Sequence, residues 1–256
     1  MATAVSTRGV SLARHRTHMF YVGAASIMLL AVLIGFRHFF FYGQAHPGRE
    51  ITPPIRTLVI VHGISLTAWV LTFLVQSVLI ATGKRRVHMM LGRIAAVLAV
   101  FMVISGFSFN LASFRLAPPA FVIWTLTMKQ FMVLGFYTLL MFAGFVAVGL
   151  WYRRRPEIHR PMMLLATLSI MSPAVARIDV VSALYQGTVL ERIFGPSLGT
   201  LVLGAAFGVL FLWRVPGIGA QWYGIGYCIF ATTQMLTIGF ARTSLWDHIA
   251  TRLLRA

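Results

Sequence analysis

The feature that most constrains the fold of this chain is a succession of long apolar runs separated by short polar connections. Seven runs can be drawn, at residues 19–41, 57–82, 92–114, 129–151, 162–183, 197–214 and 221–241. An α-helix needs roughly 20 apolar residues to cross a bilayer core, and the runs approach or exceed that length. The alternating pattern of a membrane β-barrel is absent from them. The sequence therefore predicts an all-α polytopic membrane helix bundle with about seven transmembrane helices.

The composition also indicates that lipid is the solvent for most of the protein. Of the 256 residues, 59% are hydrophobic and only 11% are charged, whereas a soluble domain of this length needs far more polar surface. We expect a basic tail at residues 1–18, a transmembrane domain at 19–241 and a surface tail at 242–256. The first run is too long for the apolar region of a signal peptide, so we expect it to remain as a signal-anchor helix. The single cysteine, Cys228, excludes a disulfide within the chain.

The start of the fourth span is ambiguous, because apolar residues begin near Pro118 and continue to Tyr152. This stretch is too long for one upright helix, so the span begins near either residue 120 or residue 129. We expect "APPAFVIWTL" to form an interfacial lead-in, with Trp124 at the level of the lipid headgroups.

The placement of the basic residues indicates an orientation. With seven spans, the N-terminal tail shares one side with the connections that follow the second, fourth and sixth spans, and this side holds more Lys and Arg than the other. Because cytoplasmic loops are enriched in these residues, we expect a cytoplasmic N-terminus. The same clusters bind anionic lipid headgroups. The net charge of +17 is spread over separate membrane loops, which argues against nucleic acid as a partner.

Two further segments indicate packing rather than chemistry. The tail "SLWDHIATRLLRA" spaces Leu245, Ile249 and Leu253 four residues apart, which predicts a short amphipathic helix on the membrane surface. The stretch "GAAFG" places Gly204 and Gly208 on one helix face, which predicts close helix packing, either within the bundle or in a homodimer.

Polar residues that lipid would exclude give the strongest functional signal. Six of them fall in the outer leaflet on several spans: His62, Asn110, Lys129, Gln130, Arg177 and Asp179. Ionisable groups within spans usually face a bundle interior or a water-filled cavity. We therefore expect an outward-facing pocket for a small anion or a quinone-like molecule, in which Asp179 pairs with Lys129, and Arg177 pairs with Asn110 or a ligand anion. The alternative is a buried polar network that only locks helices together.

Two connections share one pattern. "KRRVHMM" at residues 84–90 and "RRRPEIHRPMM" at residues 153–163 each place a basic cluster, a histidine and two methionines before an apolar run. Two imidazoles that face each other across a bundle can ligate haem iron from both sides. We therefore consider His88 and His159 as haem ligands, with His38 and His62 as a second pair nearer the outer face. The alternatives are copper ligation by the methionines and histidines that merely end helices.

The stretches "VHGISLTAWVLTFLVQSVLIATGKRRVHMMLGR" and "RRRPEIHRPMMLLATLSIMSPAVARI" resemble a group of uncharacterised bacterial multispanning membrane proteins, known only as predicted membrane proteins or domains of unknown function. The resemblance covers residues 60–180 and rests on His62, Gly63, Trp69, Gln76, His88, Leu91, Gly92, His159, Arg160, Met162, Arg177 and Ile178. It implies a multi-pass protein of a bacterial inner membrane and brings no activity with it. A more distant likeness to b561-type diheme cytochromes rests on helix count and histidine placement alone.

Three functions remain open at this stage. The first is haem-dependent electron transfer, with a quinone as the redox partner. The second is proton-coupled transport of a small anion through the outer pocket. The third is a non-catalytic membrane assembly subunit. Motifs for nucleotide binding or zinc proteolysis are absent from the sequence, so nucleotide-driven transport and that class of protease lack their machinery in this chain.

Overall fold

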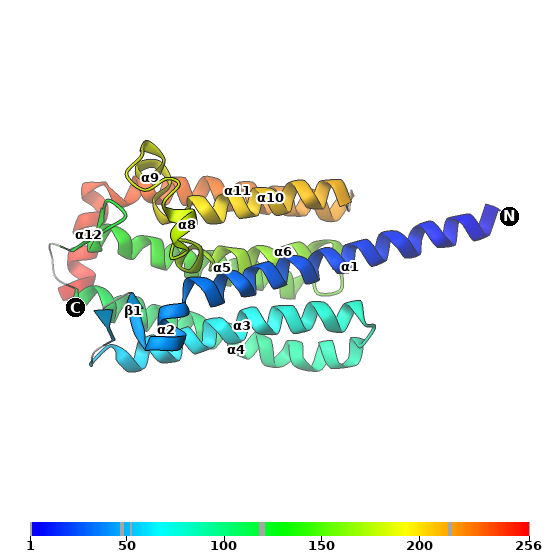
Figure 1. Ribbon diagram of the computed structural model, residues 1–256, viewed down its shortest axis with the longest axis horizontal. Helices are drawn as coiled ribbons and strands as arrows, with labels where there is room; N and C mark the ends of the chain where they lie inside the picture. Colours follow the sequence, from blue (N-terminus) through cyan, green and yellow to red (C-terminus); the bar gives the residue numbers. More distant parts are fainter. Residues whose placement is uncertain (1, 47–48, 52, 118–120, 215–216, 256) are drawn as a thin grey trace.

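Long helices account for most of the apolar runs. The computed structural model describes residues 2–46, 49–51, 53–117, 121–214 and 217–255. Its long helices lie roughly side by side (Figure 1): α1 (Ala2–Gly35), α3 (Arg56–Ala81), α4 (Arg85–Leu116), α5 (Met128–Trp151), α10 (Leu198–Arg214) and α11 (Ile218–Ala241). In the described part of the chain, six helices are long and apolar enough to cross a membrane. The predicted multi-pass, all-helical character is therefore confirmed, whereas the count of seven spans stays a prediction.

The fifth apolar run differs from the continuous helix predicted for residues 162–183. It is divided into α6 (Pro156–Ser169), α7 (Ser172–Val175) and α8 (Asp179–Ser182). Pro173 explains the first break, because proline has no N–H to donate to the carbonyl of Ser169 and its ring would clash with that carbonyl. This broken segment is nevertheless deeply buried: the side chains of Leu164, Leu165 and Leu168 are all 0% exposed. Irregular backbone at membrane depth is tolerated where protein surrounds it, and α6 packs against α5 and α11.

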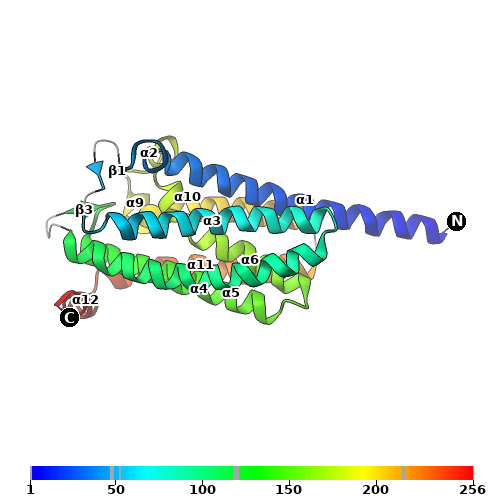
Figure 2. The same ribbon diagram turned by 90° about the horizontal axis from the view of Figure 1, so that it is seen from below.

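Short elements gather at one end of the bundle, which we call the capped end (Figures 1 and 2). They are α2 (Arg37–Tyr42), the hairpins β1 (Gln44–His46)–β2 (Arg49–Glu50) and β3 (Val122–Ile123)–β4 (Leu126–Thr127), α8, α9 (Val189–Phe194), η1 (Gly195–Ser197) and α12 (Ser244–Arg255). At the opposite end, which we call the histidine end, the α3–α4 and α5–α6 connections are tight turns, and α1 extends beyond its neighbours. The two histidine motifs therefore lie at the same end of the molecule.

The predicted lead-in to the fourth span is only partly described. Residues 118–120 lie outside the described part of the chain, and the remainder forms the β3–β4 hairpin. Its tip carries Trp124, whose ring stacks on Tyr185 with 5.3 Å between ring centroids. Burial raises the pKa of the Tyr185 phenol to about 12, so this side chain stays neutral. The helix that follows begins at Met128 and is capped by Thr127, whose side chain and that of Gln130 form a reciprocal capping box.

The predicted glycine packing face is occupied inside the bundle. A Cβ on Gly204 would lie 2.6 Å from the ring of Tyr227, and a Cβ on Gly208 would lie 3.2 Å from the ring of Tyr223. The Tyr223 hydroxyl donates a hydrogen bond to the carbonyl of Gly204 at 2.8 Å. These glycines therefore let α10 and α11 approach each other closely. A homodimer through the same face stays a prediction, and it would have to displace these tyrosines.

Helix α12 covers the end of α5 at the capped end. Trp246 and Ala250 are buried, and the Trp246 indole N–H donates to the carbonyl of Lys129 at 2.7 Å. The side chains of Leu245, Ile249 and Leu253 point away from the protein and are exposed. The helix thus has one face that packs on the bundle and a second apolar face that is exposed. Its location on the membrane surface stays a prediction.

Candidate functional site

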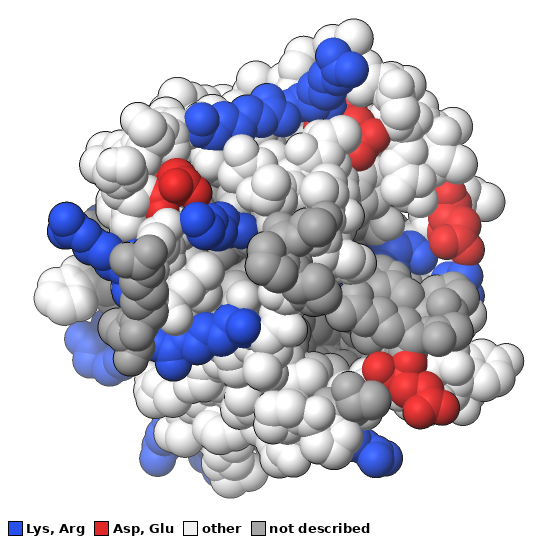
Figure 3. Space-filling model, turned by 90° about the vertical axis from the view of Figure 1, so that its left-hand side faces the viewer, with Lys and Arg blue, Asp and Glu red and all other residues white. Residues whose placement is uncertain are grey.

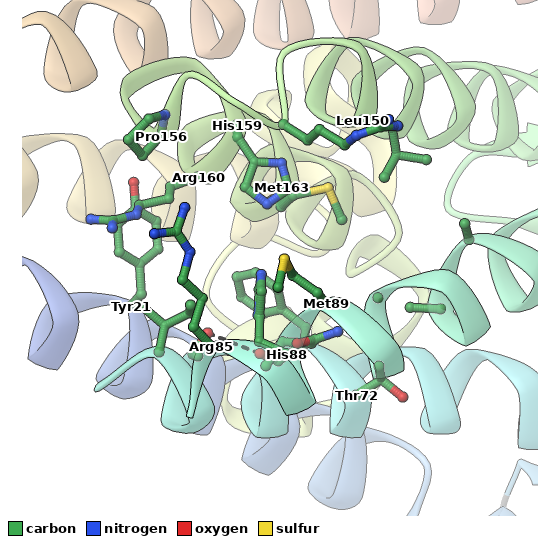
Figure 4. Close-up of a pocket in the computed structure, with 18 of the residues that line it drawn as sticks. Tyr21, Thr72, Arg85, His88, Met89, Leu150, Pro156, His159, Arg160 and Met163 are labelled. Carbon is green, nitrogen blue, oxygen red and sulfur yellow. Dashed lines mark hydrogen bonds between the residues drawn. The ribbon is translucent and has the colours of Figure 1, made fainter. Parts of the chain in front are cut away.

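The two motif histidines face each other across the histidine end. His88 is the fourth residue of α4 and His159 is the fourth residue of α6, so each lies in the first turn of its helix. Their ring centroids are 6.5 Å apart, and the ring planes are nearly perpendicular at 87°. Figure 4 shows the two side chains pointing into one space from different helices. The repeated pattern of the sequence therefore corresponds to two equivalent helix positions that the fold brings together.

The hydrogen bond of His159 leaves one of its nitrogens available. Its Nδ1 lies 2.8 Å from the carbonyl oxygen of Gly149. That carbonyl belongs to the last turn of α5 and receives no N–H from Arg153, which donates to the carbonyl of Leu150 instead. Only a protonated nitrogen can donate to a carbonyl, so Nδ1 carries the proton. The lone pair of the imidazole is then on Nε2.

One ring nitrogen of His88 also lacks a hydrogen-bond partner. Its Nδ1 is buried and has no hydrogen-bond partner. The side-chain oxygen of Gln76, on the neighbouring α3, is also buried without a partner. Buried polar atoms are normally satisfied by protein, water or a ligand, and these two atoms belong to residues that border the same cavity. The site therefore offers ligating and hydrogen-bonding groups that the protein itself does not use.

The cavity between these residues has a volume of about 1270 Å³. It lies among α1, α3, α4, α5 and α6, and it exceeds the roughly 300–1,000 Å³ that is usual for small-molecule sites. Three small residues of α4, namely Gly92, Ala95 and Ala96, form part of its wall. Because their side chains occupy little space, the wall between the histidines and the bundle centre leaves room for a broad ligand.

An aromatic residue closes the cavity toward the centre of the bundle. Trp69 of α3 is buried, and its indole N–H donates to the hydroxyl of Thr167 at 3.2 Å. Its ring also meets the edge of Phe142, with 4.8 Å between centroids. Trp69 is thus held in place from α5 and α6, and it separates the polar mouth from the apolar core.

Basic side chains surround the mouth of the cavity. Five arginines border it: Arg85, Arg93, Arg153, Arg154 and Arg160. Among the bordering residues that the structure describes, none is Asp or Glu. No group of three or more His, Cys, Asp and Glu residues in the described part of the chain could hold a metal ion. The site is therefore suited to an anionic ligand and offers two imidazoles rather than a complete protein metal cage.

The six predicted outer-leaflet residues do not share one pocket. A cavity of about 270 Å³ at the capped end is bordered by Lys129 and Gln130, and the other four do not border it. His62 lies 3.4 Å from the Ser105 hydroxyl and stacks on Phe109 at 5.3 Å. Asn110 packs against the backbone of α5 at Gly135. These groups lie at similar depths but face different neighbours.

The predicted ion pair between Asp179 and Lys129 is wrong, whereas the pairing of Arg177 with a ligand anion stays a prediction. Asp179 forms an ion pair with Arg37 at 2.6 Å, and Lys129 pairs with Asp247 at 3.1 Å. Arg177 donates to the carbonyl of Pro173 at 2.7 Å, and its guanidinium lies 5.1 Å from the centroid of the Phe36 ring. Partners from α2, α12 and the broken fifth segment replace the expected ones, because depth along a helix does not determine which neighbour a side chain faces.

The second predicted histidine pair is not brought together as the first is. The imidazole of His38 lies against Tyr42 on its own helix, with 5.8 Å between centroids, whereas His62 stacks on Phe109. Within the described residues, no ring contact joins His38 to His62. Among the described side chains, His88 and His159 are therefore the one histidine pair whose rings face each other.

Sequence reasoning missed several groups of this site. Tyr21 borders the cavity from α1, and the carbonyl of Gly149 orients His159. Nothing in the sequence marks either of them. No protein-family model, no curated protein sequence and no solved structure matches this chain.

Proposed function

We propose that this protein is a multi-pass membrane protein that holds a b-type haem between His88 and His159 and carries single electrons. The observation that supports this most is the facing pair of imidazoles at 6.5 Å, each in the first turn of its helix. A ring nitrogen that ligates a metal ion lies about 2 Å from it, so two rings at this separation leave room for one ion between them.

The residues around the pair fit such a cofactor. Histidines that ligate metals usually donate their second ring N–H to a carboxylate or a backbone carbonyl, and His159 does so to Gly149. The buried, unpaired Nδ1 of His88 supplies a second lone pair. The cavity beside the rings accommodates a large planar ligand, and Trp69 shields it from the apolar core. A haem would supply a centre that gains and loses one electron, and the chain would bind it, orient it and limit its contact with water.

The membrane arrangement that accompanies this function has seven crossings. In this proposal α6, α7 and α8 together form the fifth crossing, as a broken helix enclosed by its neighbours. The basic connections at the histidine end favour a cytoplasmic location for that end, in the inner membrane of a bacterium. The redox site then lies in the cytoplasmic half of the membrane, where a quinone in the bilayer could reach it as a redox partner.

An absorbance difference spectrum tests the proposal directly. Protein purified in detergent from haem-supplemented cells is measured in the dithionite-reduced state and in the air-oxidised state. We expect a sharp pair of visible bands that disappears in both His88→Ala and His159→Ala. The matched controls, His38→Ala and His62→Ala, should keep the full band, because their imidazoles do not face this cavity. A flat spectrum from the unaltered protein would contradict the proposal.

A second candidate function is transport of a small anion, which the basic cavity mouth without a bordering carboxylate also favours. Anion uptake into vesicles that contain the protein distinguishes transport from haem-dependent electron transfer. If the anion passes through this cavity, Arg160→Gln should reduce uptake. If it passes through the predicted outer pocket, Arg177→Gln should reduce uptake instead. If neither anion uptake nor a haem spectrum is found, a non-catalytic assembly subunit is the remaining function.

A further inference from the structure

Three side chains from three helices meet at one side of the cavity mouth. They are Tyr21 of α1, Arg85 of α4 and Arg160 of α6, and Figure 4 shows them beside the histidines. Arg160 is close enough to interact electrostatically with Tyr21, His88 and His159, and Arg85 interacts in the same way with His88. The group is thus a distinct part of the cavity, next to the imidazole pair.

The electrostatics of this group favour a negative charge. Two guanidinium groups and a phenol O–H all donate hydrogen bonds, and guanidinium groups bind carboxylates and phosphates through paired N–H donors. The N-termini of α4 and α6 lie at the same end, and helix N-termini favour anions as well. None of the described residues that border the cavity is Asp or Glu.

The burial of Tyr21 on α1 strengthens the preference of this group for an anion. Tyr21 is only 6% exposed, and its ring is fixed by contacts with Phe20 and Phe211. Charges that are partly removed from water interact more strongly than charges in bulk solvent. An anion bound between Tyr21 and the two arginines would therefore gain more than one bound to Arg86, which is exposed like Arg85 but does not border the cavity.

We infer that Tyr21, Arg85 and Arg160 form an anion subsite that binds an acidic group of the ligand held in this cavity. In the haem proposal this group is a propionate of the porphyrin, so the assignment of the ligand rests on the proposed function. The subsite itself does not require iron. Its chemistry, a carboxylate or phosphate bound by two guanidinium groups and a phenol, is tested independently of the histidines.

The test uses metal-free protoporphyrin IX and its dimethyl ester, which differ only in their acidic groups. Each is titrated into the full-length protein, purified without haem in a neutral detergent, and binding is measured from quenching of tryptophan fluorescence, since Trp69 borders the cavity. We expect the free acid to bind at least about tenfold more tightly than the ester, because hydrogen bonds to charged groups are the strong ones. Arg85→Gln and Arg160→Gln should each remove most of this preference, and Tyr21→Phe part of it.

The controls separate the subsite from iron ligation and from other anions. Arg86→Gln should leave the preference for the free acid unchanged. His88→Ala should remove iron-dependent absorbance bands and yet keep that preference, so the two proposals can fail separately. Equal binding of acid and ester, no binding of either, or an equal effect of Arg86→Gln and Arg160→Gln would overturn the inference.

Competition identifies the source of the anion. Inorganic phosphate at millimolar concentration should weaken binding of the free acid in the unaltered protein but not in Arg160→Gln, which would support a subsite open to small carboxylates and phosphates. If phosphatidylglycerol vesicles compete and phosphate does not, the arginines bind a lipid headgroup at the membrane surface, and the assignment to the cavity ligand is wrong.

Discussion

The two ends of this bundle use polar side chains in opposite ways. At the histidine end, polar groups from α1, α3, α4, α6 and the α5–α6 turn border one cavity, and two buried atoms among them, Nδ1 of His88 and the side-chain oxygen of Gln76, have no hydrogen-bond partner. At the capped end, charged groups pair with separate neighbours, as Arg37 does with Asp179 and Lys129 does with Asp247, although the buried Nε of Arg177 has no hydrogen-bond partner. At each end, the polar groups lie at similar levels along their helices. Convergence on a common space distinguishes the candidate site from the polar network.

The acidic residues are also distributed unequally between the two ends of the bundle. Of the five Asp and Glu residues, only Glu157 belongs to an element at the histidine end. The others lie in β2, α8, α9 and α12, and Figure 3 shows acidic and basic side chains interspersed on the capped end. Two ion pairs therefore neutralise part of the basic charge at the capped end. At the other end, the basic charge has few acidic neighbours and favours an anion from outside the chain.

Filling the cavity with a larger side chain should reduce ligand binding more than any other change. Ala96→Phe adds a ring to the cavity wall, so we expect porphyrin binding to fall by about 100-fold or more, because a ligand and a ring cannot occupy the same close-packed volume. Val97→Phe is the matched control, since Val97 is 71% exposed and points away from the bundle. Fluorescence quenching measures both. If Val97→Phe were equally harmful, the cavity would not be the binding site.

Disturbing the contact that orients His159 should have an intermediate effect. In Gly149→Ala the new Cβ would lie 2.9 Å from the sulfur of Met163, so the Met163 side chain must shift. We expect a loss of about 1–3 kcal/mol in the free energy of unfolding, as for overpacked cores, and a weaker haem band. Thermal unfolding in detergent and the difference spectrum measure the two effects.

Two comparisons sharpen the Gly149 experiment. Gly144→Ala lies on the same helix but in open space, so it should be neutral or stabilise the helix by about 0.5–1 kcal/mol. Adding Met163→Ala to Gly149→Ala should restore the spectrum, because it removes the atom that the new methyl group meets. A spectrum that Gly149→Ala leaves untouched would show that this carbonyl does not orient the imidazole.

The smallest effect is expected at the capped end. Lys129→Met breaks an exposed ion pair with Asp247, and such pairs contribute about 0.2–1 kcal/mol. Lys129 also donates to the Thr251 hydroxyl at 2.9 Å, so the total loss of stability should exceed that of the ion pair by about 0.5–1.5 kcal/mol. Porphyrin binding should be unchanged. A large loss of binding in this variant would mean that the two ends of the bundle are coupled. Asp247→Asn provides the same test from the other partner.

Much of the fold could be predicted from the sequence, because long apolar runs leave a chain in lipid few alternatives to helices. The break at Pro173 is visible in the sequence as well, yet the length of the run concealed it. The facing of His88 and His159 could be proposed because both occupy the same position after a basic turn. Their distance could not, since it depends on how α4 and α6 pack across about 70 residues of intervening chain.

The errors arose where depth was used in place of direction. Lys129 and Asp179 lie at similar levels, but each faces a partner that sequence reasoning did not consider, on α12 and on α2. The roles of Tyr21 and of the Gly149 carbonyl could not be predicted from the sequence either. One depends on the register of α1 against α6, and the other is a backbone atom whose availability depends on where α5 ends.

The enclosed position of α6 also affects how the protein is made. At 14 residues this helix is about 21 Å long, short of the roughly 30 Å of a bilayer core, and a segment of this length is typical of a buried core helix rather than of one that enters lipid alone. Its neighbours include α5, which precedes it, and α11, which is synthesised later. We therefore expect stable membrane integration of the fifth segment to wait for the last two long helices, so that a ribosome stalled before α10 would leave it exposed to quality-control proteases.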